Sequence, residues 1–182
     1  DVILEGDSAQ FETIIFSDTE GILLFNATPI ETEREGTVIN RNNGLLTTVE
    51  NGLPTAAYKV NIVYVINNIR LIDDVNVTIE KRIYPTEVAI IGPSRISEEI
   101  TTFTWSSPIE NITGKYNVEW ELSGNILDFV TVQYKNNNEC VIKRNSIPEN
   151  LASGQLKILL TKQLDGSVIS SSIMTVNVVN PN

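Results

Sequence analysis

The sequence contains no histidine and a single cysteine, Cys140. Without histidine, serine–histidine–aspartate and cysteine–histidine catalysis are excluded, as are histidine-ligated metal sites. One cysteine forms neither an intrachain disulfide nor a cysteine-rich zinc site. Cys140 stands in the alternating segment 139–144, where a lone cysteine usually behaves as a small apolar residue. We therefore expect Cys140 to lie in a core.

Positive charge is scarce, and long apolar runs are missing. The chain has 13 Lys and Arg against 23 Asp and Glu, a net charge of −10. Nucleic acid and anionic membrane surfaces are bound by clustered Lys and Arg, so neither is an expected partner. No stretch of about eighteen apolar residues occurs, which argues against direct membrane insertion.

Motifs that carry catalysis are absent as well. The sequence has no glycine-rich dinucleotide or phosphate loop. Its acidic residues are scattered, without the deep cleft that a pair of catalytic carboxylates needs. We expect no enzyme activity, no catalytic residues and no cofactor.

The composition of the sequence is that of a β-protein. Isoleucine and valine far outnumber alanine, and no window sustains a helical period. Branched side chains favour extended backbone, so the chain is predicted to be all-β. In the first half, strands are expected at 2–5, 10–16, 22–26, 37–40, 45–49, 58–66 and 70–80. In the second half, they are expected at 87–91, 101–105, 116–122, 129–134, 139–144, 155–163 and 168–179.

Two pairs of segments repeat along the chain. Residues 56–80 and 153–179 each read as a strand, a two-residue turn and a second strand, with turns at Asn67-Asn68 and Asp165-Gly166. Upstream, 37–48 matches 130–144. Repeats made of strands and turns predict two tandem immunoglobulin-like antiparallel β-sandwiches. We place them at 1–82 and 83–182, with the boundary near Pro85, and expect the short link to make the pair a semi-rigid spacer.

A family resemblance rests on the second half. Tyr116–Val132, Gly154–Thr161 and Leu164–Val178 resemble the bacterial immunoglobulin-like domains of the group-two and intimin/invasin type, with Trp120 at the tryptophan position. In the first half, 43–47 resembles that family's asparagine-glycine-leucine-threonine turn, and Phe25 stands nearest the tryptophan position. The resemblance implies a sandwich fold and an extracellular setting, and it transfers no site residues.

Candidate contacts with a ligand gather in the second half. Trp105 ends a predicted strand, and Asn111 and Lys115 lie in the long loop 107–115; loops of sandwich domains commonly carry recognition. Asn111 also fits a glycosylation sequon, as do Asn26 and Asn76. Two acidic segments, 18–21 and 73–74 near the boundary, are weak calcium candidates, because calcium prefers oxygen ligands.

These observations predict a non-catalytic structural or adhesion module of a bacterial surface or secreted protein, acting as a spacer or stalk. The sequence does not begin with Met, so we expect a piece of a longer or processed chain whose targeting segment lies elsewhere. Two alternatives stay open. One is an adhesin module that binds a host or surface glycan or protein; the other is a decoration or fibre domain of a phage virion.

Overall fold

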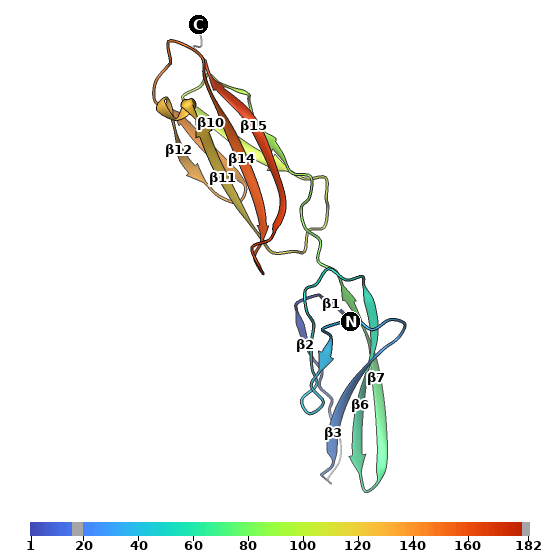
Figure 1. Ribbon diagram of the computed structural model, residues 1–182. Coiled ribbons are helices and arrows are strands. Elements are labelled where there is room, and N and C mark those ends of the chain that lie inside the picture. The colour runs from blue at the N-terminus through green and yellow to red at the C-terminus, as the bar shows by residue number, and fades with distance from the viewer. Residues whose placement is uncertain (16–19, 180–182) are drawn as a thin grey trace. The chain divides into compact units, whose positions relative to one another are not determined.

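A computed structural model describes residues 1–15 and 20–179 of the chain. The chain divides into two compact units, Asp1–Arg82 and Ile83–Asn182. Within the described residues there is no α-helix, and each unit consists of β-strands in two layers (Figure 1). The expectation of an all-β chain is confirmed.

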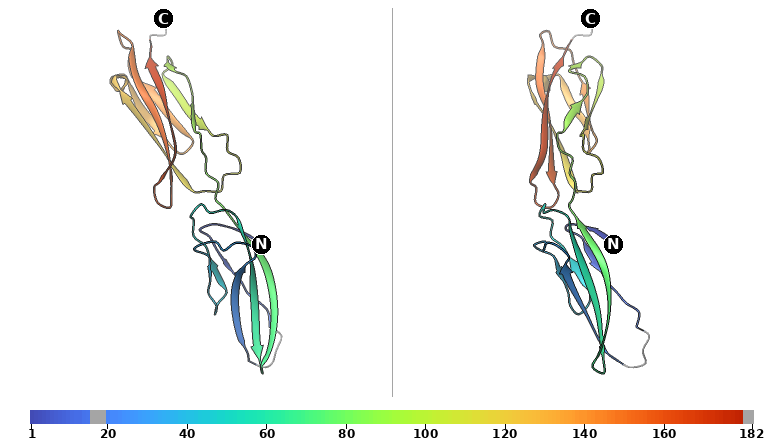
Figure 2. Two further views of the ribbon diagram at one scale, coloured as in Figure 1. Left: turned by 45° about the vertical axis from the view of Figure 1, so that its right-hand side comes forward. Right: turned by 90° about the vertical axis from the view of Figure 1, so that its right-hand side faces the viewer.

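The described residues of the first unit, 1–15 and 20–82, form seven strands in two sheets. The larger sheet has the order β1-β7-β6-β3 and the smaller has the order β2-β5-β4. β1 runs parallel to β7, and every other pairing is antiparallel. Figure 2 shows β6 and β7 side by side as one long hairpin. The strands are β1 Val2–Leu4, β2 Ser8–Gln10, β3 Ile22–Pro29, β4 Val38–Ile39, β5 Leu45–Thr47, β6 Ala56–Ile66 and β7 Ile69–Glu80.

The second unit contains eight strands and one short 3-10 helix. Its sheets have the orders β11-β14-β15-β9 and β12-β13-β10-β8, with β9 parallel to β15. Its elements are β8 Ala89–Ile91, β9 Arg95–Ile96, β10 Ile100–Ser106, β11 Tyr116–Gly124, η1 Asn125–Asp128, β12 Val130–Lys135, β13 Glu139–Arg144, β14 Ala152–Lys162 and β15 Val168–Val178.

The two units share one strand order. The sheet β1-β7-β6-β3 of the first unit corresponds strand for strand to β9-β15-β14-β11 of the second, and β2-β5-β4 corresponds to β10-β13-β12. Among the strands that the structure describes, β8 has no counterpart in the first unit. The second unit thus pairs its strands in the ABED and CFG arrangement of an immunoglobulin-like sandwich.

Each unit has its own core at the positions that alternation predicts. Phe25 on β3 and Trp120 on β11 occupy corresponding strands, and both are 3% exposed. The expected burial of Trp120 is therefore confirmed, and so is that of Cys140, which belongs to the core of the second unit. Alternation places these side chains inward because successive residues of a strand face opposite sides of the sheet.

The turn between β4 and β5 requires glycine. Gly44 has φ 71°, and its amide donates to the Asn40 carbonyl at 2.9 Å. A Cβ at Gly44 would lie 2.7 Å from both the Phe11 carbonyl oxygen and the ring of Phe25. At Asn43-Gly44 the turn thus lies so close to the core that there is no room for a side chain at position 44.

One predicted hairpin turn is confirmed and the other is wrong. Asn67 and Asn68 connect β6 to β7 with φ 49° and 65°, the left-handed pair of a two-residue hairpin turn. By contrast, Asp165-Gly166 does not form a two-residue turn: the strands end at Lys162 and resume at Val168. The Gly166 amide bonds back to the Lys162 carbonyl, which closes a longer loop.

The strand expected at 10–16 is also wrong. The strand is Ser8–Gln10, residues 11–15 belong to no strand, and Phe16 lies outside the described residues. Its partner β5 begins at Leu45, just after the Gly44 turn, so beyond Phe11 there is no strand to pair with. The elements β9 and η1 were not predicted, because they are too short to show a period.

The turn at Asn67-Asn68 generates the first prediction. Asn68→Gly should stabilise the first unit by a few tenths of a kcal/mol, whereas Asn68→Ala should destabilise it by about 1 kcal/mol, because left-handed backbone is strained for residues with a Cβ. Urea unfolding followed by circular dichroism measures both changes. The matched control is Asn42→Ala, an exposed turn residue without positive φ. Equal effects at the two positions would contradict the turn type.

Candidate functional site

Trp105 packs at the end of β10. Its indole Nε1 donates to the Asn137 carbonyl at 2.7 Å, and its ring lies edge-on to Tyr116 at 6.1 Å between centroids. On β11, Trp120 Nε1 likewise donates to the Asn136 carbonyl at 3.0 Å. The two indoles therefore bind the turn between β12 and β13. Trp105 is half-buried and contributes to the packing of this turn.

The loop 107–115 presents Asn111 and Lys115 to solvent. Asn111 has φ 55°, and both side chains are exposed. The base of the loop is fixed, because the amides of Thr113 and Gly114 donate to the Ile83 carbonyl at 3.0 and 2.8 Å. Asn111 and Lys115 thus lie on an anchored loop within the second unit.

The acidic calcium candidates do not form a site in the described residues. Asp18 and Thr19 lie outside those residues. Asp73 and Asp74 are neighbours on β7 and face opposite sides of the sheet, and Asp74 pairs with Lys59 at 2.9 Å. They also lie well away from the unit boundary, since eight extended residues span roughly 25 Å. Across residues 1–15 and 20–179, no group of three or more acidic or cysteine side chains is placed to hold a metal ion.

The three sequon asparagines lie in different surroundings. Asn26 is on β3 and Asn76 on β7, where the Asn76 carbonyl accepts a hydrogen bond from the N-terminal amine of Asp1. Only Asn111 is in a loop.

A buried charge cluster in the first unit was not predicted from the sequence. Glu5, Arg34 and Arg82 are 1%, 2% and 7% exposed. Arg34 Nη2 donates to Glu5 Oε2, which also accepts the amides of Gly52 at 2.9 Å and Asn51 at 3.2 Å. Glu5 Oε1 accepts the Arg82 amide at 2.9 Å. Glu5, Arg34 and Arg82 lie far apart in the sequence, and no local pattern around any of them predicts that they come together.

Arg82 links the end of β7 to the residues that follow β1. Its Nε donates to the Glu5 carbonyl at 2.8 Å, its Nη2 to Asp7 Oδ1 at 2.6 Å, and the Glu50 carboxylate lies 3.4 Å from Nε. With both carboxylate oxygens of Glu5 engaged and almost no exposure, the cluster offers no room for a substrate. It is therefore a structural element.

Two groups have shifted pKa values. Burial by itself raises the pKa of Glu5, but the four hydrogen bonds that its carboxylate accepts, that of the Arg82 amide first, hold the pKa below its usual 4.5. Burial raises the pKa of the Cys140 thiol to about 11, although the charge of Lys135 opposes this. A thiol with so high a pKa is a poor nucleophile at neutral pH.

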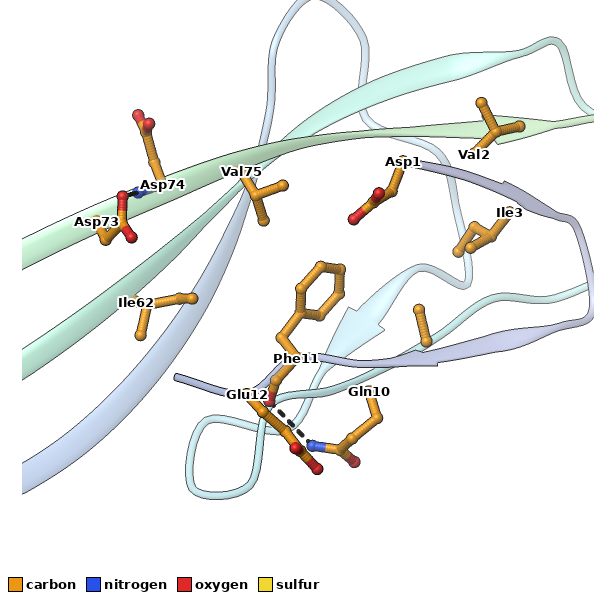
Figure 3. Close-up of a pocket in the computed structure, with 11 residues that line it drawn as sticks. Asp1, Val2, Ile3, Gln10, Phe11, Glu12, Ile62, Asp73, Asp74 and Val75 are labelled. Carbon is orange, nitrogen blue, oxygen red and sulfur yellow. Dashed lines mark hydrogen bonds between the residues drawn. The ribbon is translucent and has the colours of Figure 1, made fainter. Parts of the chain in front are cut away.

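A groove in the described part of the first unit lies between β2 and β7. It has a volume of about 590 Å³ and contains the side chains of Ile3, Phe11, Ile62 and Val75, with Asp1 and Asp73 at its rim. Figure 3 shows the ring of Phe11 directed into this space from below β7. We call this space the β2–β7 slot.

The slot continues into a second, more apolar groove of about 460 Å³ along residues 13–15. Its walls are apolar side chains of the β6–β7 hairpin and of the segment after β2. They include Ile14, Ile15, Tyr64, Ile66 and Leu71. The wall exists because the strands of the smaller sheet are two or three residues long, whereas β6 and β7 have 11 and 12. The alternating pattern of β6 predicted its apolar side chains, but it did not predict that some of them would line a groove.

No family model and no curated protein matches the chain. Among solved structures, it is similar to the human desmocollin-1 ectodomain at 15% identity and TM-score 0.36, covering all of this chain and 36% of that chain. It is also similar to chicken VE-cadherin EC1-2 at 12% identity, covering 100% of this chain and 97% of that one, with TM-score 0.41. A chimeric titin Z1Z2 gives 12% identity, 100% and 92% coverage, and TM-score 0.41.

The chain spans about a third of the length of the desmocollin-1 ectodomain. The assignment of the fold rests on the strand order. No helix in the described part of the chain is long and apolar enough to span a membrane.

The buried cluster generates the second prediction. Because the folded pKa of Glu5 is depressed, its contribution to stability is present above about pH 4.5 and is lost as the pH falls through the folded pKa. Glu5→Gln should lower the free energy of unfolding of the first unit by roughly 3 kcal/mol at pH 7, since Arg34 stays buried without its anion. The difference from the native chain should shrink in acid.

Urea titrations at several pH values measure this difference. Both tryptophans lie in the second unit, so their fluorescence reports that unit alone, while circular dichroism reports both. The exposed Glu33→Gln is the matched control. A Glu5→Gln effect that is the same at pH 3 and pH 7 would show that the carboxylate charge is not what stabilises the unit.

Proposed function

We propose that this chain is a non-catalytic, load-bearing module of an extracellular protein, a spacer that holds the parts of a longer chain apart. The bacterial resemblance in the second half supports placing that protein on a bacterial surface or among secreted proteins. The proposal includes two independently folding domains, 1–82 and 83–182. Within the described residues, buried charges and core aromatics serve packing, and the sequence has no histidine for acid–base work.

The observation that carries this proposal is the parallel pairing of the first and last strands of the first unit. β1 pairs with β7 from Val2↔Thr78 to Leu4↔Glu80. Pulling the unit by its two ends moves parallel neighbours past each other, so their hydrogen bonds are loaded together and not one after another. The second unit has a similar pairing of β9 with β15.

The charge cluster reinforces the same strands. The Glu5 amide donates to the Glu80 carbonyl at 2.8 Å, directly beyond the β1–β7 ladder. Arg82 then ties the end of β7 to the backbone of Glu5 and the carboxylate of Asp7. Buried and charge-assisted hydrogen bonds are stronger than neutral exposed ones, so they add resistance at the end of the ladder where load leaves β7.

The third prediction concerns force. In single-molecule stretching between marker domains, Arg82→Gln should lower the unfolding force of the first unit and raise its unfolding rate about tenfold or more, since each 1.4 kcal/mol of lost stabilisation corresponds to a factor of ten. The force of the second unit should not change. Lys59→Gln is the matched control, because it breaks an exposed ion pair inside the β6–β7 hairpin.

Two outcomes would contradict load bearing. One is unfolding of both units without a resolvable force peak. The other is an equal fall in force for Arg82→Gln and Lys59→Gln, which would mean that the terminal strands do not carry the load.

A second candidate function is direct adhesion through the loop 107–115, with Trp105, Asn111 and Lys115 as ligand contacts. The anchoring of this loop to Ile83 favours it, because a fixed loop loses little entropy on binding. The ligand would be a host or surface glycan or protein.

The fourth prediction tests adhesion. If the loop binds, the purified chain should show saturable binding to at least one member of a panel of mucins, glycans and matrix proteins, and Lys115→Ala should weaken it several-fold by removing a charged contact. Lys59→Ala, an exposed lysine in the first unit, is the control. Absence of saturable binding across the panel would remove this candidate and leave the spacer.

A further inference from the structure

The larger sheet of the first unit has an outer face, which points away from β2, β5 and β4. Phe25, Val60 and Val77 lie in the core, on the inner side of β3, β6 and β7. Because successive residues of a strand face opposite sides of the sheet, the residues between them point outward. The three strands lie side by side (Figure 1), so their outward residues form rows across the sheet.

This outer face is apolar at the end nearest the Asn67-Asn68 turn. Five of the six side chains in the two rows beside the turn are aliphatic, and Ile22 and Ile72 among them are 62% and 61% exposed. We call the five aliphatic residues the outer patch. From the turn, the two rows are Ile22, Val65 and Arg70, then Leu24, Val63 and Ile72.

The second unit has no such patch on the corresponding sheet, in which β11, β14 and β15 take the places of β3, β6 and β7. The shared strand order therefore does not require an apolar outer face. A contiguous exposed apolar surface of this kind marks an interaction site. In the second unit the two corresponding rows contain four polar and two apolar side chains: Asn117, Thr161 and Val168, then Glu119, Leu159 and Ser171.

The charges on this face suit a second copy of the chain. The outward residues of β3, β6 and β7 include two positive side chains, Lys59 and Arg70, and one negative side chain, Asp74. Lys59 and Asp74 pair with each other at 2.9 Å, which leaves Arg70 as the charge beside the outer patch. The whole chain has a net charge of −10, so most surfaces of two copies repel each other, and this face avoids that repulsion.

The order of the rows decides how two copies fit together. The row beyond the outer patch is polar, with Asn26, Asn61 and Asp74. A two-fold axis parallel to the strands sets β6 against β6 of the second copy and β7 against its β3, so each row meets the same row. Aliphatic side chains then contact aliphatic ones, and polar side chains contact polar ones. An antiparallel arrangement with the same overlap would set the aliphatic rows against polar rows.

We propose that the first unit forms a symmetric, reversible dimer through the outer face of β3, β6 and β7, with the Asn67-Asn68 turns of both copies at the same end. Val63 lies against Val63 of the second copy and Ile72 against its Leu24. Arg70 lies over Ile22 of the second copy, within reach of the exposed Glu20 that precedes β3. This interface goes beyond the spacer function and does not depend on it.

The size of the face sets the strength of the dimer. Sheets that pack face to face lie about 10 Å apart, and the rows from Ile22 to Thr28 on three strands cover roughly 25 Å by 14 Å. Each copy therefore buries on the order of 400 Å², and the total falls below the roughly 1,200 Å² of a stable interface. We expect a weak dimer with a dissociation constant on the order of 100 μM.

The fifth prediction is a concentration-dependent dimer of the full chain. Sedimentation velocity between about 10 μM and 1 mM should show a reversible shift from monomer to dimer. Ile72→Asp should raise the dissociation constant about tenfold or more, because it buries a charge against aliphatic side chains. Ile100→Asp is the matched control, since Ile100 is an isoleucine of the second unit that is 46% exposed, and it should leave the dimer unchanged.

Two charge reversals test the arrangement. Arg70→Glu sets acidic side chains opposite each other and Glu20→Arg sets basic ones opposite each other, so each variant alone should dimerise several-fold more weakly. An equimolar mixture of the two should recover dimerisation, because opposite charges then meet at both contacts. Both side chains are exposed, so neither change should disturb folding. In the control mixture, Arg70→Glu with Glu33→Arg should recover less, because Glu33 lies outside the face.

Three results would overturn the proposal. The first is a chain that stays monomeric at all concentrations up to about 1 mM. The second is a dimer that Ile72→Asp leaves unaltered, since the contact would then lie elsewhere. The third is a mixture of the two charge-reversal variants that associates no better than either alone, which would contradict the arrangement with both turns at the same end. Stretching forces play no part in these outcomes, so the spacer proposal stands or falls separately.

Discussion

The closing hairpin of each unit is the structure against which everything else packs. β6–β7 and β14–β15 are the longest pairings, and each supplies both the two central strands of a four-stranded sheet and the partner of a short parallel strand. Without a disulfide, stability must come from burial on the inner face of that hairpin and from the ladder at its edges. What covers the inner face therefore decides how complete each sandwich is.

The inner face of the hairpin is covered differently in the two units. In the second, a four-stranded sheet that includes β8 covers the hairpin with a continuous apolar core. In the first, three short strands cover only part of a longer hairpin, and its core is smaller. One end is closed by the polar cluster of Glu5, Arg34 and Arg82, while the slot beside β2 stays open. A buried ion cluster fixes geometry at the cost of desolvation, which apolar packing does not incur.

The fold class, the buried positions and one hairpin turn follow from the sequence alone. These are local properties: branched residues favour strands, alternation sets the buried face as at Trp120 and Cys140, and Asn67-Asn68 tolerate left-handed backbone. By contrast, the contacts of Glu5 with Arg34 and Arg82, and the end of β2 at Gln10, are seen only in the three-dimensional structure. Each of these depends on which distant segments become neighbours and on how long they run, and no single segment encodes that.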